Sequence, residues 1–126
     1  MKLKDIVKTE EQIKEMGYKI ENNLIEEVNV NAIAHFDNIT SFEIYCSNIC
    51  PMSRRNNIGN LGYVIRAFIE LFDLSEEDGL FLTKIKKIPC RLVFKNNFGL
   101  GYVCIGIGHF MKDKFVLIDD LARLDG

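Results

Sequence analysis

The sequence has 126 residues, of which 48% are hydrophobic and 27% are charged, and its formal net charge is −2. This length and composition indicate one globular domain, residues 1–126, and exclude a disordered chain. The mild acidity argues against a duplex-DNA binder. No apolar run approaches the roughly 20 residues that a membrane span needs. The charged start of the sequence argues against a signal peptide.

The first part of the chain predicts a short helix followed by a hairpin. Thr9 and Gln12 have the spacing of a capping box, which marks the start of a helix of about two turns. Apolar and polar residues then alternate over 28–36 and again over 42–46. This period predicts two antiparallel strands, joined by a tight turn at Asp37-Asn38.

A predicted loop and the main helix follow. Residues 47–60 are polar, contain proline and glycine and show no clean period, so they predict a loop of a length that is usually functional. From Leu61 to Phe72, apolar side chains recur at helical spacing, which predicts an amphipathic helix at roughly 60–73. Capping residues predict a further helical turn at 75–78.

The last third of the chain is rich in predicted strands. Its pattern indicates strands at 91–95, 102–110 and 115–118, turns at 96–97 and 112–113, and a helical turn at 119–122. Strands grouped on both sides of one long helix are typical of an α+β fold. We expect a mostly antiparallel sheet packed on one main helix, with a short N-terminal helix.

The cysteines do not indicate a metal site. Cys46 and Cys50 form a C-x3-C pair, and Cys90 and Cys104 a C-x13-C pair, whereas zinc sites usually use C-x2-C or C-x4-C pairs. Without a secretory signal we expect a reducing compartment and no disulfides. Cys90 and Cys104 lie in apolar segments, where cysteine acts as a small hydrophobic residue. We therefore expect no metal and no cofactor.

Catalysis is poorly supported by the sequence. His35 and His109 are its two histidines, and Cys104 lies five residues before His109 on one predicted strand, which would place their side chains on opposite faces. The G-x-G pairs at 99–101 and 106–108 lack the third glycine of a dinucleotide-binding turn. They indicate close packing, or the close approach of a ligand. We expect no enzyme, although a small enzyme using either histidine as acid or base stays open.

The strongest physical signal for a ligand precedes the main helix. Arg54 and Arg55 are followed by Asn57 and Asn60. Free N–H groups at a helix N-terminus attract anions, and arginine matches phosphate in a bidentate way. These four residues are candidates for a phosphate-binding site, with a solvated surface loop as the alternative.

A second polar group surrounds the predicted C-terminal hairpins. Its members are Arg91, Asn96, Asn97, Phe98, His109, Lys112 and Asp113. Phe98 lies in a glycine-flanked turn, where an aromatic ring could stack on a base with roughly 1–3 kcal/mol. The alternative is that Phe98 covers the edge of the core. With the basic loop, these residues complete the predicted ligand site.

Three segments resemble a known family. They are NLGYVIRAFIELFDL at 60–74, LTKIKKIPCRLVF at 82–94 and IGIGHFMKDKFV at 105–116. Together they resemble small phage proteins of the first type of Thoeris anti-defence protein. The resemblance implies a homo-oligomer in the host cytoplasm that sequesters a cyclic ADP-ribose signal, or a cyclic oligonucleotide, without cleaving it. Lys112 and Asp113 resemble a basic–acidic pair at the family's ligand pocket, with lysine where arginine is expected.

Two other functions compete with sequestration of a cyclic nucleotide. The first is a phage protein that binds and inhibits a host defence nuclease, in the manner of an anti-CRISPR, which the net negative charge favours only weakly because the acidic residues form no long run. The second is a phage structural or regulatory module without a ligand. For the sequestering function, a small domain has little volume for an enclosed pocket, so we expect the pocket at a subunit interface.

Overall fold

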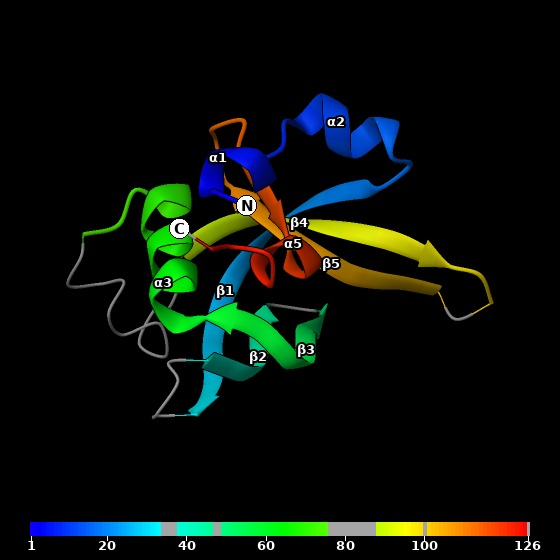
Figure 1. Ribbon diagram of the computed structural model, residues 1–126. Coiled ribbons are helices and arrows are strands. Elements are labelled where there is room, and N and C mark those ends of the chain that lie inside the picture. The colour runs from blue at the N-terminus through cyan, green and yellow to red at the C-terminus, as the bar shows by residue number, and fades with distance from the viewer. Residues whose placement is uncertain (34–37, 47–48, 76–87, 100, 126) are drawn as a thin grey trace.

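The computed structural model describes the backbone of residues 1–33, 38–46, 49–75, 88–99 and 101–125 (Figure 1), and the side chains in these ranges except those of 27–61. Its elements are α1 (Leu3–Ile6), α2 (Glu10–Glu15), β1 (Lys19–Ile33), β2 (Asn38–Cys46), β3 (Ile49–Asn60), α3 (Leu61–Phe72), β4 (Ile88–Asn97), β5 (Gly101–His109), β6 (Phe115–Leu117) and α5 (Ile118–Leu121). In this described part, no helix is long and apolar enough to cross a membrane.

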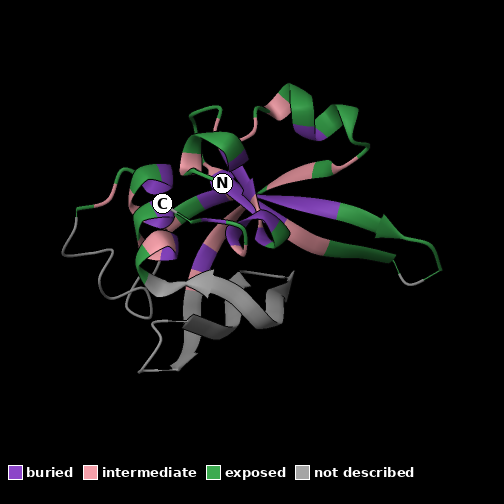
Figure 2. Cartoon of the chain, in the orientation of Figure 1, coloured by how far each residue is buried: buried purple, intermediate pink, exposed green. Residues whose placement is uncertain are grey.

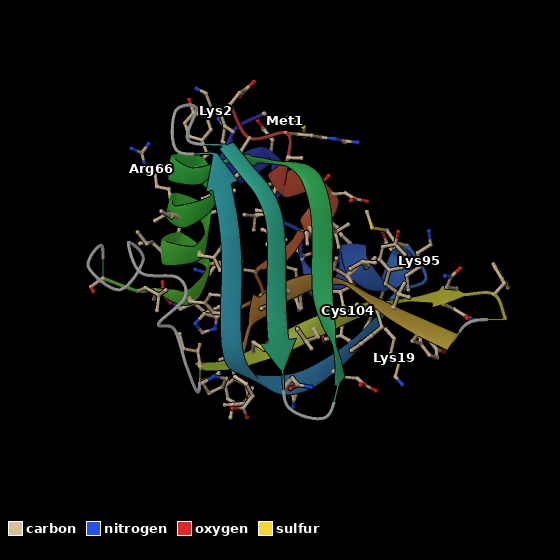
Figure 3. All side chains as sticks on the ribbon, turned by 90° about the horizontal axis from the view of Figure 1, so that it is seen from below. Met1, Lys2, Lys19, Arg66, Lys95 and Cys104 are labelled. Carbon is tan, nitrogen blue, oxygen red and sulfur yellow. The ribbon has the colours of Figure 1, made fainter. Side chains whose placement is uncertain are left out.

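The strands form one antiparallel sheet in the order β3-β2-β1-β4-β5-β6. Strand β1 belongs to both halves of it, because its first part pairs with β4 and its second part with β2. Ile25 is the residue that does both, opposite Ile88 of β4 and Cys46 of β2. Figure 3 shows β1, β2 and β3 side by side, with β4 and β5 crossing behind them. The α+β class is confirmed, and so is the predicted pairing of 28–33 with 42–46. Residues 34–37 lie outside the described residues, and Asn38, predicted in the turn, begins β2.

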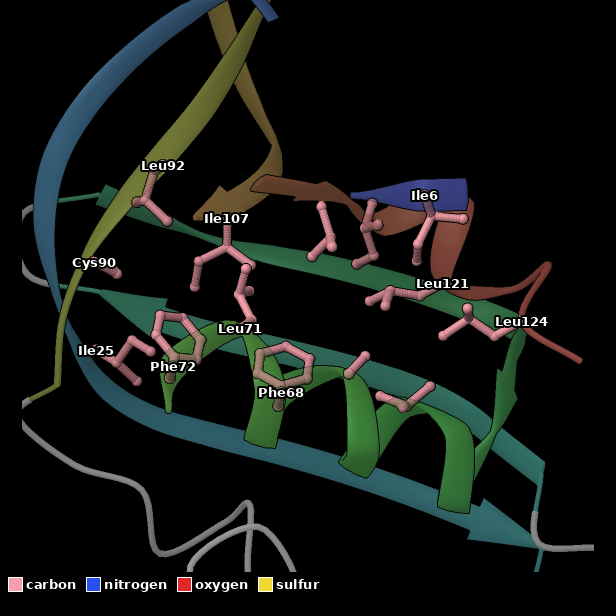
Figure 4. Packing of buried hydrophobic residues seen from close by; sticks show 14 of the residues in the cluster. Ile6, Ile25, Phe68, Leu71, Phe72, Cys90, Leu92, Ile107, Leu121 and Leu124 are labelled. Carbon is pink, nitrogen blue, oxygen red and sulfur yellow. The ribbon is translucent and has the colours of Figure 1, made fainter. Parts of the chain in front are cut away.

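The main core lies between α3 and the sheet (Figure 4). Phe68, Leu71 and Phe72 of α3 are buried in one cluster with Leu92 of β4 and Ile107 of β5. The short elements α1 and α5 close the same core with Ile6, Ile118 and Leu121. The apolar stripe predicted for residues 60–73 therefore packs as expected for an amphipathic helix.

A smaller core lies on the other side of β4. Ile13 of α2, Val93 of β4 and Phe115 of β6 are fully buried there. Thr9 accepts a hydrogen bond from the N–H of Gln12, and the Gln12 side chain accepts from the N–H of Thr9, at 3.2 and 2.9 Å. The predicted capping box is thus confirmed, and it starts the helix that covers this second core.

Two predictions about local structure are wrong. Residues 49–60 are not a loop but edge strand β3, in which Ser41 pairs with Arg55 and Phe42 with Arg54. An edge strand tolerates polar side chains and a proline, which is why its pattern is not that of a buried strand. Asn96 and Asn97 end strand β4, and the turn lies at Phe98 and Gly99 instead. Residues 76–78 of the helical turn predicted at 75–78 lie outside the described residues, and so does His35.

The G-x-G pair at 106–108 is explained by close packing against β6. A Cβ atom on Gly106 would lie 2.8 Å from both the Leu117 side chain and the Val116 carbonyl oxygen. A Cβ atom on Gly108 would lie 2.7 Å from the Lys114 carbonyl oxygen and collide with the Phe115 ring. Only glycine lets β6 approach β5 this closely, which confirms the packing interpretation.

Candidate functional site

Charged side chains gather where the C-terminal end of α3 meets the turn between β5 and β6. Lys112 Nζ lies 2.6 Å from Asp73 Oδ2, and Lys114 Nζ lies 3.5 Å from Asp73 Oδ1. On the same carboxylate, His109 Nε2 lies 3.4 Å from Oδ2. We call Asp73, His109, Lys112 and Lys114 the Asp73 cluster. Two lysines around one carboxylate leave the cluster with net positive charge.

His109 shapes the turn that carries both lysines. Its Nδ1 accepts hydrogen bonds from the backbone N–H groups of Met111 and Lys112, at 3.0 and 2.9 Å. A nitrogen that accepts cannot carry a proton, so these bonds assign the neutral tautomer with its proton on Nε2, facing Asp73. The imidazole is therefore engaged on both sides.

Arg91 and Asp113, two of the predicted ligand residues, hold the turn in place. Arg91 donates from Nε to the carbonyl of His109, at 2.9 Å, and from Nη2 to the carbonyl of Lys112, at 2.8 Å. Its guanidinium lies 4.5 Å from the centre of the Phe115 ring, a cation–π contact. Asp113 accepts a hydrogen bond from the N–H of Glu10 at the start of α2. Both side chains therefore position the turn. The charge of Arg91 also faces Glu10, with 3.6 Å between Nη1 and Oε1, whereas the charge of Lys112 faces Asp73.

The cluster shifts the pKa values of two of its members. The hydrogen bond from Lys112 lowers the pKa of Asp73 below its usual 3.8, and the charge of Lys114 adds to this effect. Burial lowers the pKa of His109 below its usual 6.5, against the opposing pull of the Asp73 carboxylate. Near neutral pH, His109 is therefore uncharged and Asp73 ionised.

We expect the protein to lose stability as the pH falls below about 6.5, the usual pKa of histidine. The unfolded chain takes up a proton on His109 at that pH, whereas the folded chain resists it, so the free energy of unfolding falls with falling pH. Thermal unfolding of the wild type and His109→Gln, at neutral pH and at about pH 5.5, measures this. Between neutral pH and about pH 5.5, His109→Gln should lose less stability than the wild type. An equal loss in the two proteins would contradict a lowered pKa of His109 in the folded state.

A groove between α1 and α3 opens next to the Asp73 cluster. It has a volume of about 300 Å³ and is lined by Leu3, Lys4, Val7, Ala67, Glu70, Leu71 and Lys114. This volume lies at the lower end of the range of roughly 300–1,000 Å³ found for small-molecule sites. Lys114 belongs to both features, and it also donates to the carbonyl of Glu70 at 2.8 Å. The groove thus combines an apolar floor with three charged lining residues, Lys4, Glu70 and Lys114.

Three of the predicted ligand residues lie elsewhere, at the tip of the β4–β5 hairpin. Asn96 and Asn97 end β4, and Phe98 in the turn is 91% exposed. Figure 2 shows this hairpin buried at its base and exposed along its outer half. In an extended strand, Asn96 is about 17 Å from Arg91. The structure therefore separates the tip from the Asp73 cluster.

The basic residues predicted to flank the main helix lie on strand β3. Arg54 and Arg55 pair with Phe42 and Ser41 of β2, and β3 is irregular beyond them, because Gly59 pairs with Ile39. Measured along β2 from the partners Ser41 and Phe42 to Asn38, which pairs with Asn60, the arginines lie roughly 10–14 Å from the start of α3. The arginines therefore lie on a strand and not in a loop next to the helix, while Asn60 directly precedes α3. Their side chains and those of Asn57 and Asn60 lie outside the described residues, so the binding role of all four stays a prediction.

The predicted geometry of Cys104 and His109 is corrected by a β-bulge. Cys104 pairs with Phe94 and His109 with Cys90, while Ile105 is the extra residue between these pairs. The bulge puts Cys104 and His109 on the same face of β5, about 13 Å apart, too far for a Cys–His pair. Cys90 and Cys104 form no disulfide bond. Among the described side chains, no group of His, Cys, Asp and Glu residues could hold a metal ion.

Two members of the cluster, Asp73 and Lys114, are absent from the residues predicted from sequence. Asp73 follows the last apolar residue of α3, where helices usually end with glycine or asparagine, and this departure is a local signal. Lys114 follows Lys112 and Asp113 in a predicted turn, but nothing local indicates that it reaches α3. Its role depends on how the turn packs.

Comparisons with protein-family models, with curated proteins and with solved structures found no match for this chain. The resemblance to the Thoeris anti-defence family stays a prediction from the three segments quoted above. The candidate site is supported by its geometry.

Proposed function

We propose that this chain binds a phosphate-bearing cyclic nucleotide signal and holds it without cleaving it. The observation that carries the proposal is the position of Lys114, which lines the apolar groove and also belongs to the Asp73 cluster. A nucleotide has an aromatic base that needs an apolar surface and phosphates that need cations. The groove and the cluster supply these two environments side by side.

The hydrogen bonds of His109 favour binding of the ligand without cleavage. A general base must have a free lone pair within reach of the proton it removes. The lone pair on Nδ1 of His109 accepts two backbone N–H groups, and the proton on Nε2 faces Asp73. Acid–base chemistry by this residue would require the turn to open.

The resemblance narrows the ligand and the setting. A relative of the first type of Thoeris anti-defence protein would capture cyclic ADP-ribose signals in the cytoplasm of a phage-infected cell. It would act as a homo-oligomer, with the pocket completed by a second copy. Nanomolar capture requires about −12 kcal/mol, which is why we expect further contacts beyond one open groove.

Calorimetry with cyclic ADP-ribose isomers, followed by mass spectrometry of the ligand released on heating, tests both halves of the proposal. We expect binding, and recovery of the ligand with unchanged mass. A hydrolysed or linearised product would show an enzyme. Absence of heat at micromolar ligand would overturn binding of these compounds, and native mass spectrometry of the same sample reports the assembly.

Removing both lysines of the cluster should weaken binding strongly. Lys112→Met with Lys114→Met keeps much of the apolar stems but removes both charges, and we expect affinity to fall roughly ten- to hundredfold. Lys95→Met is the matched control, because Lys95 is exposed on β4, about 13 Å along the strand from Arg91, which holds the turn of the cluster. Equal affinity of the double variant and the control would place the ligand elsewhere. In the same titration, a loss of affinity in the Arg54→Ala and Arg55→Ala variants would place the ligand at β3.

A further inference from the structure

We propose that the Asp73 carboxylate occupies the position of a phosphate group in the binding site, and that the ligand binds by displacing it. This inference depends on the proposed function and adds to it a residue that sets affinity and specificity. Asp73 would then act as an internal competitor, in contrast to a residue that contacts and assists the ligand.

The backbone at Asp73 is unusual for an aspartate. It has a φ of 54° directly after α3, and the following N–H of Leu74 donates to the carbonyl of Ile69 at 2.9 Å, which closes the helix. Glycine or asparagine is the common residue in this left-handed position. A negative charge there also faces the negative end of the helix dipole. Local structure therefore disfavours Asp73, and its retention depends on tertiary contacts.

Those contacts form a cradle for an anion. Lys112, Lys114 and the Nε2–H of His109 approach one carboxylate from the β5–β6 turn, at 2.6, 3.5 and 3.4 Å. A phosphate offers the same kind of oxygen acceptors, in larger number and with comparable or greater charge. The same three donors therefore suit a phosphate group that arrives from the adjoining groove.

Displacement requires no change in the core. The side chains of Asp73 and Lys112 are 46% and 57% exposed, so the carboxylate can turn into solvent. Lys114 stays in place when it leaves, because its Nζ also donates to the carbonyl of Glu70. Arg91 holds the turn through the carbonyls of His109 and Lys112, independently of Asp73. The cradle thus persists after the exchange.

Asp73→Asn tests the exchange, because asparagine tolerates the left-handed conformation and keeps the size but removes the charge. With inorganic pyrophosphate as the probe in calorimetry, we expect the variant to bind roughly three- to tenfold more tightly than the wild type. Glu15→Gln is the control for net charge, since Glu15 is exposed on α2 outside the cluster, and it should bind like the wild type.

The outcomes separate this inference from the proposed function. Wild-type binding with equal or weaker binding by Asp73→Asn would overturn the displacement and leave the binding site standing. Absence of binding by both proteins would overturn the site itself. In the wild type, NMR should also show the amide signals of Asp73 and Leu74 shifting on addition of pyrophosphate. Unmoved signals at saturation would show that Asp73 stays in place.

Discussion

Replacing Phe115 with alanine is expected to lower the free energy of unfolding by about 3–5 kcal/mol. Phe115 is fully buried, packs with Ile13 and Val93, and carries the guanidinium of Arg91 on its ring. The truncation would leave a cavity between α2 and the sheet and would remove the surface on which Arg91 rests. Because domains are stable by only about 5–15 kcal/mol, this is a large part of the total.

Urea unfolding followed by circular dichroism measures the Phe115→Ala effect, as a shift in the midpoint at constant slope. Phe98→Ala is the matched control, since it removes the same ring from a side chain that is 91% exposed. We expect that control to stay within about 0.5 kcal/mol of the wild type. A comparable loss in both variants would contradict the description of the second core.

Replacing Gly108 with alanine should destabilise the protein by about 1–3 kcal/mol or more, the usual cost of overpacking. The new Cβ atom would collide with the Phe115 ring and would lie 2.7 Å from the carbonyl oxygen of Lys114, which is backbone and cannot move alone. The expected result is a displaced β6, and with it a displaced turn and lysines. Urea unfolding measures the stability, and pyrophosphate titration measures the site.

Gly17→Ala separates collision from backbone strain. Gly17 has a φ of 84° but open space around its position, so alanine there carries strain without a collision and should cost about 1 kcal/mol. Combining Gly108→Ala with Phe115→Leu should cost less than the sum of the two single changes, because the smaller side chain relieves the collision. Strict additivity would show that Gly108 and Phe115 do not press on each other.

Both variants bear on the candidate site through the same segment. Strand β6 follows directly on the turn that carries Lys112 and Lys114, and the carbonyl of Phe115 accepts from the N–H of Lys8. The position of the lysines relative to Asp73 therefore depends on how β6 packs against β5. The core beneath the turn and the charges above it form one structural unit.

The candidate site could be predicted only in part. Local patterns identified Arg91, His109, Lys112 and Asp113, and the structure brings these four together around one turn. The separate roles of these residues could not be predicted from neighbouring residues, because Arg91, His109 and Asp113 make hydrogen bonds to backbone atoms that only the fold brings close. Asp73 is 39 residues from Lys112 along the chain, and only the packing of α3 against the sheet makes them neighbours.

The sequence by itself determined the elements whose signals are local: the capping box at Thr9, the amphipathic helix α3, the hairpin of β1 with β2, and the C-terminal strands. Periodicity and capping depend on residues a few positions apart, so the chain carries them wherever it folds. Tertiary structure alone decided that residues 49–60 form an edge strand, that β1 joins both halves of the sheet, and that a carboxylate at the end of α3 collects cations from the β5–β6 turn. These features depend on pairing between distant segments, whose hydrogen bonds and charges exist only once the fold has closed.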